Sequence, residues 1–433
     1  MNFKNLFNSK KTGKIHPSIF MFLFLPFGVL YGYVSVTIGF LLTKAGIPLA
    51  LVAPVISVAL LPNIFKFIWA PLVDTTLTVK KWYIIANAVT AIGIFVTGIL
   101  PLKVEYLTLM TVVVLITNFG NTFIAMSTES LLAHDTPDNL KGRAGGWLQA
   151  GNLGGLGLGG GAGLWLAERL PEPWMAGAII AAACLLCSLG LFFLPEPKAF
   201  IRDKSYLKTI GNLNRDIWTL LKSRMGFLAL FLCFLPIGSG AASNLWSAIS
   251  NDWGASADTV ALVIGILGGV LSAAGCLVGG WVCDLMDRKK AYIMFGMVQA
   301  LCAVGMAFSP STEIMFIIWT SLYAVSTGLT YAGFSAFVLE AIGKGAAATK
   351  YNVYASLSNA PIYYMIYIDE WAHSKWSAFG MLSAEAIMAL IGVVLFINNP
   401  IWIWFSVITL ICILFIIYIR QFISILNPPA IFR

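Results

Sequence analysis

Thirteen apolar stretches follow one another along the chain, and their lengths leave few folds open to it. Each is long enough to cross roughly 30 Å of hydrocarbon as a helix that rises about 1.5 Å per residue. They lie near residues 17–43, 47–73, 82–101, 105–131, 144–167, 173–194, 226–250, 256–283, 291–309, 313–341, 350–368, 377–397 and 401–419. Hydrophobic residues make up 59% of the chain and charged residues 11%, a balance that excludes a water-soluble domain. We predict an all-α integral membrane protein.

The basic residues between these stretches fall mainly on one side of the predicted membrane. Twenty lysines and arginines lie in the loops of one side, and four lie in the loops of the other. Because positive loops resist translocation, the richer side and the N-terminus are predicted to be cytoplasmic. The thirteenth stretch is joined by a short uncharged link at Asn398–Pro400, so it either adds a spanning helix or bends back and lies on the membrane.

The longest hydrophilic stretch, residues 196–224, carries charges of both signs near the middle of the chain. We interpret it as a cytoplasmic linker that forms an amphipathic helix on the membrane surface. It divides the chain into a first six-helix bundle at 1–195 and a second at 225–397. Residues 398–433 are predicted to form the additional C-terminal helix and a tail.

Other classes of function find no support in the composition. The net charge is +8, but the basic residues are scattered between apolar segments, so a nucleic-acid partner is not expected. The seven cysteines lie inside apolar runs, and the three histidines are dispersed, so neither a disulfide framework nor a metal site is predicted. The glycine-rich run at 151–163 follows no strand and favours close helix packing over nucleotide binding. We expect no cofactor and no enzymatic activity.

The two halves of the chain resemble each other when shifted by about 210 residues. Pro26 and Gly28 then fall on Pro236 and Gly238, which predicts a break in the first helix of each half. Rare charged residues also coincide: Asp74 with Asp284, Lys81 near Lys290, Glu129 near Glu340, and Lys141 near Lys350. Two parallel six-helix repeats around a central cavity are the architecture of the major facilitator superfamily.

Two motifs carry a resemblance to that superfamily. The loop from Gly279 through Asp284 to Lys289 is similar to its signature loop, which implies that the acid caps a neighbouring helix end and pairs with a basic residue at the inner gate. The segment FKFIWAPLVD at residues 65–74 resembles the group that includes AmpG-type muropeptide permeases and acetyl-coenzyme A transporters. Some bacterial siderophore permeases share this layout. The resemblance implies import of an organic solute, often driven by protons.

The gate residues expected from these loops belong to both halves. They are Asp74, Lys80, Lys81, Arg143, Asp284, Arg288 and Lys289.

Lys66 is the first candidate for a transport role, because an ammonium inside a span is costly unless it faces a wet cavity or an anionic partner. It can bind a solute carboxylate or phosphate, or exchange acidic partners as the halves move. The alternatives are that it extends to the cytoplasmic surface, or that it forms a permanent ion pair, for example with Asp74 two turns away.

Four acids are candidates for proton coupling. Glu129 and Glu340 lie at the predicted inner ends of their helices, where partial burial favours protonation. The alternative is that each one pairs with the basic loop of its own half and serves the gate. Glu385 is the deepest acid of the second half, and it is either a proton carrier or a protonated structural residue. Asp369 lies nearer the outer rim and could accept a proton there.

Polar and aromatic residues inside the spans are candidates for the solute cavity, which must offer hydrogen bonds and stacking faces. Each tyrosine alone is more often a packing residue. The set is Tyr31, Tyr33, Asn118, Asn121, Gln149, Asn152, Asn244, Trp246, Tyr323, Tyr331, Asn352, Tyr354, Asn359, Tyr363 and Tyr364.

We predict a monomeric secondary transporter in a bacterial inner membrane, with a small polar solute, protons and membrane lipid as its partners. The expected solute is muropeptide-like, peptide-like or siderophore-like. The alternatives are an exporter of drug-like compounds and a signal transducer that keeps the gate motifs but moves no solute.

Overall fold

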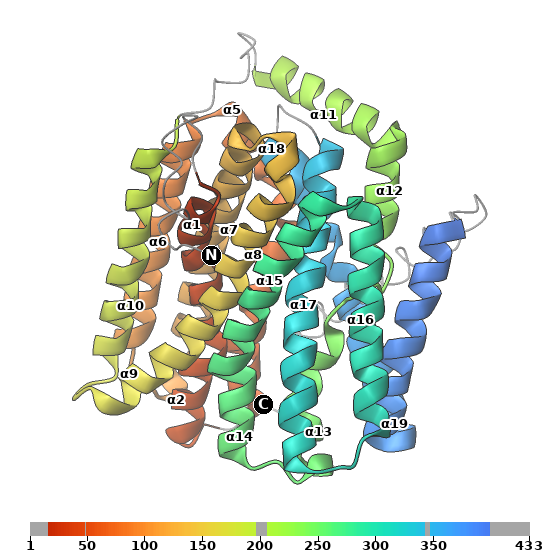
Figure 1. The fold of residues 1–433 in the computed structure, drawn as a ribbon. Coiled ribbons are helices and arrows are strands. Elements are labelled where there is room, and N and C mark those ends of the chain that lie inside the picture. The colour runs from red at the N-terminus through yellow and green to blue at the C-terminus, as the bar shows by residue number, and fades with distance from the viewer. Residues whose placement is uncertain (1–15, 48, 196–205, 343–346, 399–433) are drawn as a thin grey trace, which may run out of the picture.

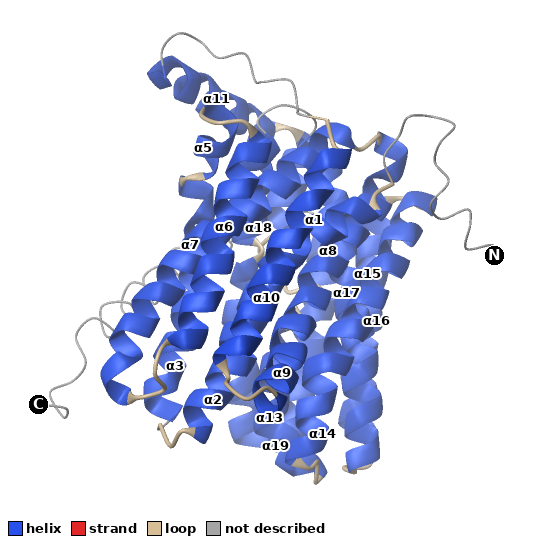
Figure 2. Ribbon diagram, turned by 90° about the vertical axis from the view of Figure 1, so that its left-hand side faces the viewer, coloured by secondary structure: helices blue, strands red, loops and turns tan. Residues whose placement is uncertain are grey.

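A computed structural model describes residues 16–47, 49–195, 206–342 and 347–398. These residues form helices and no strand. The helices run along one common direction, and only α11 (Tyr206–Lys222) lies across one end of the molecule (Figures 1 and 2). The thirteenth apolar stretch, at 401–419, lies outside the described residues.

The helices before α11 form six consecutive segments. The first is α1 (Ser18–Gly32), a π-helical turn and α2 (Gly39–Lys44); the second is α3 (Leu49–Ser57), α4 (Leu61–Phe65) and α5 (Ala70–Thr75); the third is α6 (Val79–Ile99); the fourth is α7 (Leu107–Asp135); the fifth is α8 (Lys141–Gly157), a second π-helical turn and α9 (Gly163–Arg169); and the sixth is α10 (Trp174–Cys187) with a 3₁₀ extension to Phe193.

Six further segments follow α11 in the described chain. They are α12 (Arg224–Leu232) with α13 (Trp246–Ile249); α14 (Ala257–Leu262) with α15 (Gly268–Leu285); α16 (Arg288–Phe308); α17 (Glu313–Ile342); α18 (Ala347–Leu357) with the first part of α19 (Asn359–Asn398); and the second part of α19. The backbone of α19 leaves the helical conformation at Trp376 and Ser377, and this kink separates the last two segments.

Eight stretches of the described helices are long and apolar enough by themselves to cross a membrane. The last of them, Thr349–Ile397, contains two segments on either side of the kink. The segments at 49–75 and 224–253 are interrupted, and the one at 141–169 is rich in glycine. Together these observations agree with the predicted arrangement of twelve spans.

The predicted break in the first helix at Pro26 is wrong. Pro26 lies inside a continuous α1, whereas the corresponding helix of the second half does break after Leu232. There Gly238 and Gly240 adopt φ values of 62° and 70°, which residues with a side chain rarely reach. The two prolines therefore occupy equivalent positions but only the second lies in an interrupted helix.

The second segment, predicted as one helix, is instead divided by short 3₁₀ turns. One of these turns is Lys66–Ile68, between α4 and α5. Pro54, Pro62 and Pro71 lie in this segment, and proline both lacks the N–H that continues a helix and clashes with the preceding turn. Lys66 is therefore placed on a tightened turn.

Glycine brings the central helices into close contact. A Cβ atom on Gly28 of α1 would lie 2.0 Å from the carbonyl oxygen of Asn152 in α8, and one on Gly275 of α15 would lie 2.1 Å from that of Val325 in α17. Gly157 and Gly269 meet where α8 crosses α15, so the same small-residue packing joins the two halves.

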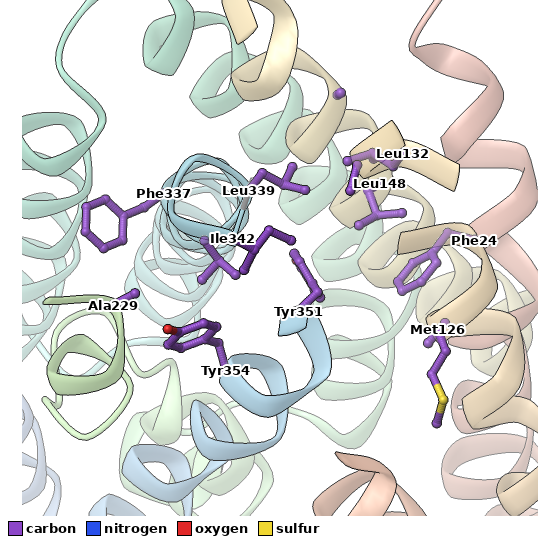
Figure 3. Close-up of a cluster of buried hydrophobic side chains, with 14 of the residues drawn as sticks. Phe24, Met126, Leu132, Leu148, Ala229, Phe337, Leu339, Ile342, Tyr351 and Tyr354 are labelled. Carbon is purple, nitrogen blue, oxygen red and sulfur yellow. The ribbon is translucent and has the colours of Figure 1, made fainter. Parts of the chain in front are cut away.

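The largest buried apolar cluster extends over both halves (Figure 3). It includes Phe24 and Met126 from the first half and Phe337, Ile342 and Tyr354 from the second. We call the end of the molecule formed by α5, the start of α8, the end of α15 and the start of α18 the gate end. It lies at the top of Figure 1, next to α11.

Candidate transport site

At the gate end, an acid of the second half binds the N-terminus of a helix of the first. The Asp284 side chain is 1% exposed and accepts hydrogen bonds from the backbone N–H groups of Gly142 (2.7 Å) and Arg143 (3.0 Å). Its second oxygen also accepts from Nε of Arg143 at 2.8 Å. A Cβ atom at position 142 would come within 2.6 Å of this carboxylate, so glycine permits the close approach. Free N–H groups and the helix dipole stabilise an anion here.

The first half makes a reciprocal contact. Asp74, near the end of α5, accepts hydrogen bonds from the backbone N–H of Thr349 (2.9 Å) and from its hydroxyl (2.7 Å). Thr349 lies in the first turn of α18. Each half thus places the acid at the end of its second segment on the start of the fifth segment of the other half.

The remaining predicted gate residues have different partners. Arg288 pairs with Glu340 at 2.9 Å and donates to the carbonyl of Asp138 in the other half. Lys80 donates to the carbonyl of Leu194, and the Lys289 ammonium lies 4.7 Å from the centre of the Phe396 ring.

Glu340 and Lys81 are both exposed. The Glu340 side chain is 44% exposed, so its expected burial is wrong and its contact with Arg288 favours the alternative role at the gate. Lys81 is exposed, and its backbone N–H is capped by the Thr78 hydroxyl. His16 lies near the start of α8, where burial and the charge of Arg143 lower its pKa.

Beneath the gate, Lys66 is buried beside an acid. Its side chain is 6% exposed, and Nζ lies 4.0 Å from Oε1 of Glu129, whose side chain is 3% exposed. Nζ also lies 5.9 Å from the centre of the Phe27 ring. The other oxygen of Glu129 accepts a hydrogen bond at 2.8 Å from the amide of Asn352 in the second half. The lysine neither reaches the surface nor pairs with Asp74.

A second buried hydrogen-bond chain crosses the same boundary. The Gln149 amide donates to the Ser335 hydroxyl at 2.8 Å, and this hydroxyl lies 2.9 Å from that of Tyr351. Asn152 donates to the Gln149 carbonyl at 3.1 Å. We call Lys66, Glu129, Asn352, Gln149, Ser335 and Tyr351 the polar junction, because these six residues join the halves inside the molecule.

Polar groups also gather inside the second half. The Tyr323 hydroxyl donates to Oε1 of Glu385 at 2.7 Å, and the Ser239 hydroxyl reaches the same oxygen at 3.2 Å. Asp369 lies next to Glu385 and is fully buried. Trp246 packs edge-on against Tyr323, with 5.2 Å between the ring centres.

A partly open cavity lies in the second half. It is lined by Ser239, Tyr292, Thr330 and the predicted residues Tyr331 and Asn359. Its lining combines hydroxyl and amide groups with apolar side chains, which is typical of sites for small organic molecules.

The other predicted cavity residues are placed differently. Tyr33 is 1% exposed and packs near Gly98 and Gly177, and Tyr354 and Tyr364 donate to backbone carbonyls. The amide of Asn118 bonds within its own helix, and that of Asn121 bonds to the carbonyl of Phe27. Tyr31 is half-buried, Tyr363 contacts Tyr367, and Asn244 is exposed.

Sequence reasoning missed Ser239, Ser335, Thr349 and Tyr351. Serine and threonine are common within membrane helices, where their hydroxyls usually bond to the preceding turn, so residue type carries little signal. The glycines on either side of Ser239 were the one available indication.

The sequence pattern of the Major Facilitator Superfamily matches residues 18–363. An anhydromuropeptide permease of Escherichia coli (strain K12) is 22% identical over 344 residues, which cover 75% of this chain and 68% of that protein. An uncharacterized protein of Haemophilus influenzae is 25% identical over 351 residues, covering 74% of this chain and 79% of the other.

Solved structures show the same fold. The Escherichia coli fucose:proton symporter FucP has a TM-score of 0.68 at 15% identity, with 88% of this chain and 97% of the other covered. The proton:xylose symporter XylE has a TM-score of 0.65 at 14% identity, with coverage of 88% and 95%. With its integral, multi-pass helical fold, the chain belongs to the major facilitator superfamily of transporters.

Proposed function

We propose that this protein is a secondary active transporter that imports a small polar organic solute by alternating access, coupled to protons. The observation that carries the proposal is the Lys66–Glu129 ion pair, whose acid is also bonded to Asn352 in the opposite half. The bond from Asn352 must break when the halves separate at the gate end. Glu129 would then lose a donor and Lys66 would become accessible.

A buried ammonium that gains access to a cavity can bind an anionic solute group. Breaking an ion pair inside a low-dielectric site is costly unless a new partner compensates for it. A solute carboxylate or phosphate is such a partner for Lys66, and a proton is such a partner for Glu129. This exchange links solute binding to the movement of the two halves.

The gate contacts support the same cycle. Asp74 and Asp284 each hold a helix of the other half, and both contacts exist only while the gate end is closed. We assign Arg143, Arg288, Lys80, Lys81 and Lys289 to the support of this closed state. The polar junction lies behind it as a second barrier.

For the solute, we propose a muropeptide-like or peptide-like compound, with a siderophore as the second candidate. Similarity to the anhydromuropeptide permease supports the first, and the FKFIWAPLVD segment agrees with it. Tyr331, Asn359, Asn152 and the junction residue Gln149 offer the hydrogen bonds that such a solute needs. We place the protein in a bacterial inner membrane, as a monomer with a cytoplasmic N-terminus.

Uptake in intact cells tests this proposal. Labelled anhydromuropeptide and labelled ferric siderophore are supplied to cells that carry the wild type, Lys66→Ala or Lys66→Arg, with and without a protonophore. We expect uptake of one solute, sensitive to the protonophore, to fall at least tenfold in Lys66→Ala. Lys44→Ala is the matched control, because Lys44 is 61% exposed and its pair with Glu168 lies at the opposite end.

The outcomes separate the parts of the proposal. Undiminished uptake by Lys66→Ala would exclude Lys66 from the cycle. Uptake that is insensitive to the protonophore would exclude proton coupling. Efflux from preloaded cells without uptake would favour an exporter, and no flux of either solute in either direction would remove the support for this cargo and favour the transducer.

A further inference from the structure

Two acids contact each other inside the second half without any basic partner. Asp369 is fully buried and Glu385 is 3% exposed. They come from the two parts of α19, on either side of its kink, which folds the chain back and brings the two carboxyl groups together. Among the described residues, no lysine, arginine or histidine forms an ion pair with either acid.

The hydrogen-bond donors around this pair are too few for two ionised groups. Tyr323 and Ser239 both donate to Oε1 of Glu385. Within the described chain, Oε2 of Glu385 and both oxygens of Asp369 are buried without an N–H or O–H donor. Three buried acceptor oxygens of the described residues therefore face a low-dielectric interior without a hydrogen-bond donor.

One added proton removes both the charge repulsion between the acids and the shortage of hydrogen-bond donors. Two carboxylates in contact repel each other, and burial without a cation makes each charge costly. A proton on one carboxyl group removes one charge and supplies the missing O–H donor to the other. Glu129 and Glu340 differ in this respect, because Lys66 and Arg288 lie beside them.

We propose that Asp369 and Glu385 hold one proton between them and that this pair is a second proton-binding site of the transport cycle, besides Glu129. The proton arrives from water, forms an O–H bond with a carboxylate oxygen, and leaves to water on the other side of the membrane, so no other bond changes. The role in the cycle rests on the proposed transport function. The shared proton itself does not.

The backbone break in the seventh segment connects this pair to the cavity. Ser239 lies between Gly238 and Gly240, whose positive φ values turn its hydroxyl towards Glu385 while the residue also lines the cavity. The Ser239 hydroxyl therefore links a molecule bound in the cavity to the carboxyl pair. Among the described residues, the ionisable groups facing the pair are two tyrosines, Tyr323 of α17 and Tyr364 of α19.

Infrared spectroscopy of the full-length protein in lipid tests the shared proton without any solute. A protonated carboxyl group has a C=O stretching band that moves in heavy water. We expect this band at neutral pH in the wild type, and its loss in both Asp369→Asn and Glu385→Gln. Glu370→Gln is the matched control, because Glu370 is adjacent in sequence but exposed.

A wild-type spectrum without the band would refute the proposal even if no variant folds. A band that survives in both variants and disappears in Glu129→Gln would move the proton to the polar junction. Loss of the wild-type band on addition of sodium would mean that the oxygens bind a metal cation in place of a proton. The milder Tyr323→Phe removes one donor to Glu385, and we expect it to shift the band.

Failure of the transport proposal gives a different result. If the band behaves as expected but uptake ignores a protonophore, the pair holds a proton that does not drive transport. If uptake depends on the proton gradient but the band is absent, the coupling site lies elsewhere.

Discussion

Replacing Asp284 by asparagine should open the gate end. The substitution keeps the shape of the side chain and removes its charge. In the closed state the carboxylate accepts two backbone hydrogen bonds from the start of α8 and one from Nε of Arg143. All three partners belong to the other half, so these contacts stabilise only conformations in which the halves meet at this end.

The size of the effect follows from these contacts. A hydrogen bond to a charged group contributes about 1.5–3 kcal/mol, compared with about 1 kcal/mol for a neutral one. We discount the pair with Arg143, whose side chain is 46% exposed, because solvent screens it. Asparagine has one acceptor oxygen, so one backbone bond is weakened to the neutral value and the other is lost. This costs the closed state at least about 2 kcal/mol, which raises the open fraction about 30-fold or more.

A buried cysteine already present in the chain can report this opening. Cys276 is fully buried on α15, where its carbonyl oxygen faces Gly146 of α8 across the boundary between the halves. With the other six cysteines replaced, its alkylation by a maleimide can proceed only when the halves separate. If opening and closing are fast, the alkylation rate follows the open fraction.

We expect Asp284→Asn to accelerate alkylation of Cys276 by one to two orders of magnitude. Asp287→Asn is the control, because Asp287 is exposed and caps α16, a role that asparagine fills equally well. Equal rates in Asp284→Asn and the wild type would show that the carboxylate does not hold the halves together. Equal acceleration by Asp287→Asn would point to a general loosening of the fold.

Three further predictions concern packing, the linker and orientation. Gly155→Ala should destabilise the protein by about 1–2 kcal/mol, because its Cβ would lie 2.6 Å from the carbonyl of Leu25, whereas Gly154→Ala, with its nearest atom at 3.4 Å, should be tolerated in the same thermal unfolding assay. Trp218 of α11 is 60% exposed and should insert between lipid headgroups, so brominated lipids should quench a smaller share of the fluorescence in Trp218→Phe. A larger share would place Trp218 in water. Green fluorescent protein fused to the N-terminus should fluoresce, whereas activity of a fused alkaline phosphatase there would reverse the predicted orientation.

Periodicity and hydropathy were sufficient for the architecture, because a membrane span must be long and apolar whatever its neighbours are. The breaks and bends within individual helices could not be predicted in the same way. Pro26 and Pro236 have similar local sequences, yet α1 continues through Pro26 and packs its Gly28 against α8. The break near Pro236 depends on the positive φ values of Gly238 and Gly240, and the packing that selects them comes from other helices.

The candidate site shows the same division. An isolated lysine within FKFIWAPLVD and a lone glutamate within an apolar run were recognisable, because a charge in a span is unusual. The residues that contact this lysine and this glutamate could not be recognised from the sequence. Lys66 pairs with Glu129 and not with Asp74, which is closer in sequence. The alignment of Glu129 with Glu340 did not indicate that the first is buried and the second exposed.

The sequence by itself determined the helical class, the spans and the family motifs, since these depend on residue type and on spacing along one helix. The tertiary structure decided which charges are paired and which are left to share a proton. Asp369 and Glu385 become neighbours only because α19 folds back at its kink, and Asn352 reaches Glu129 only where the two halves meet. Contacts of this kind depend on the rotation and depth of whole helices against each other, which the order of residues along one helix does not specify.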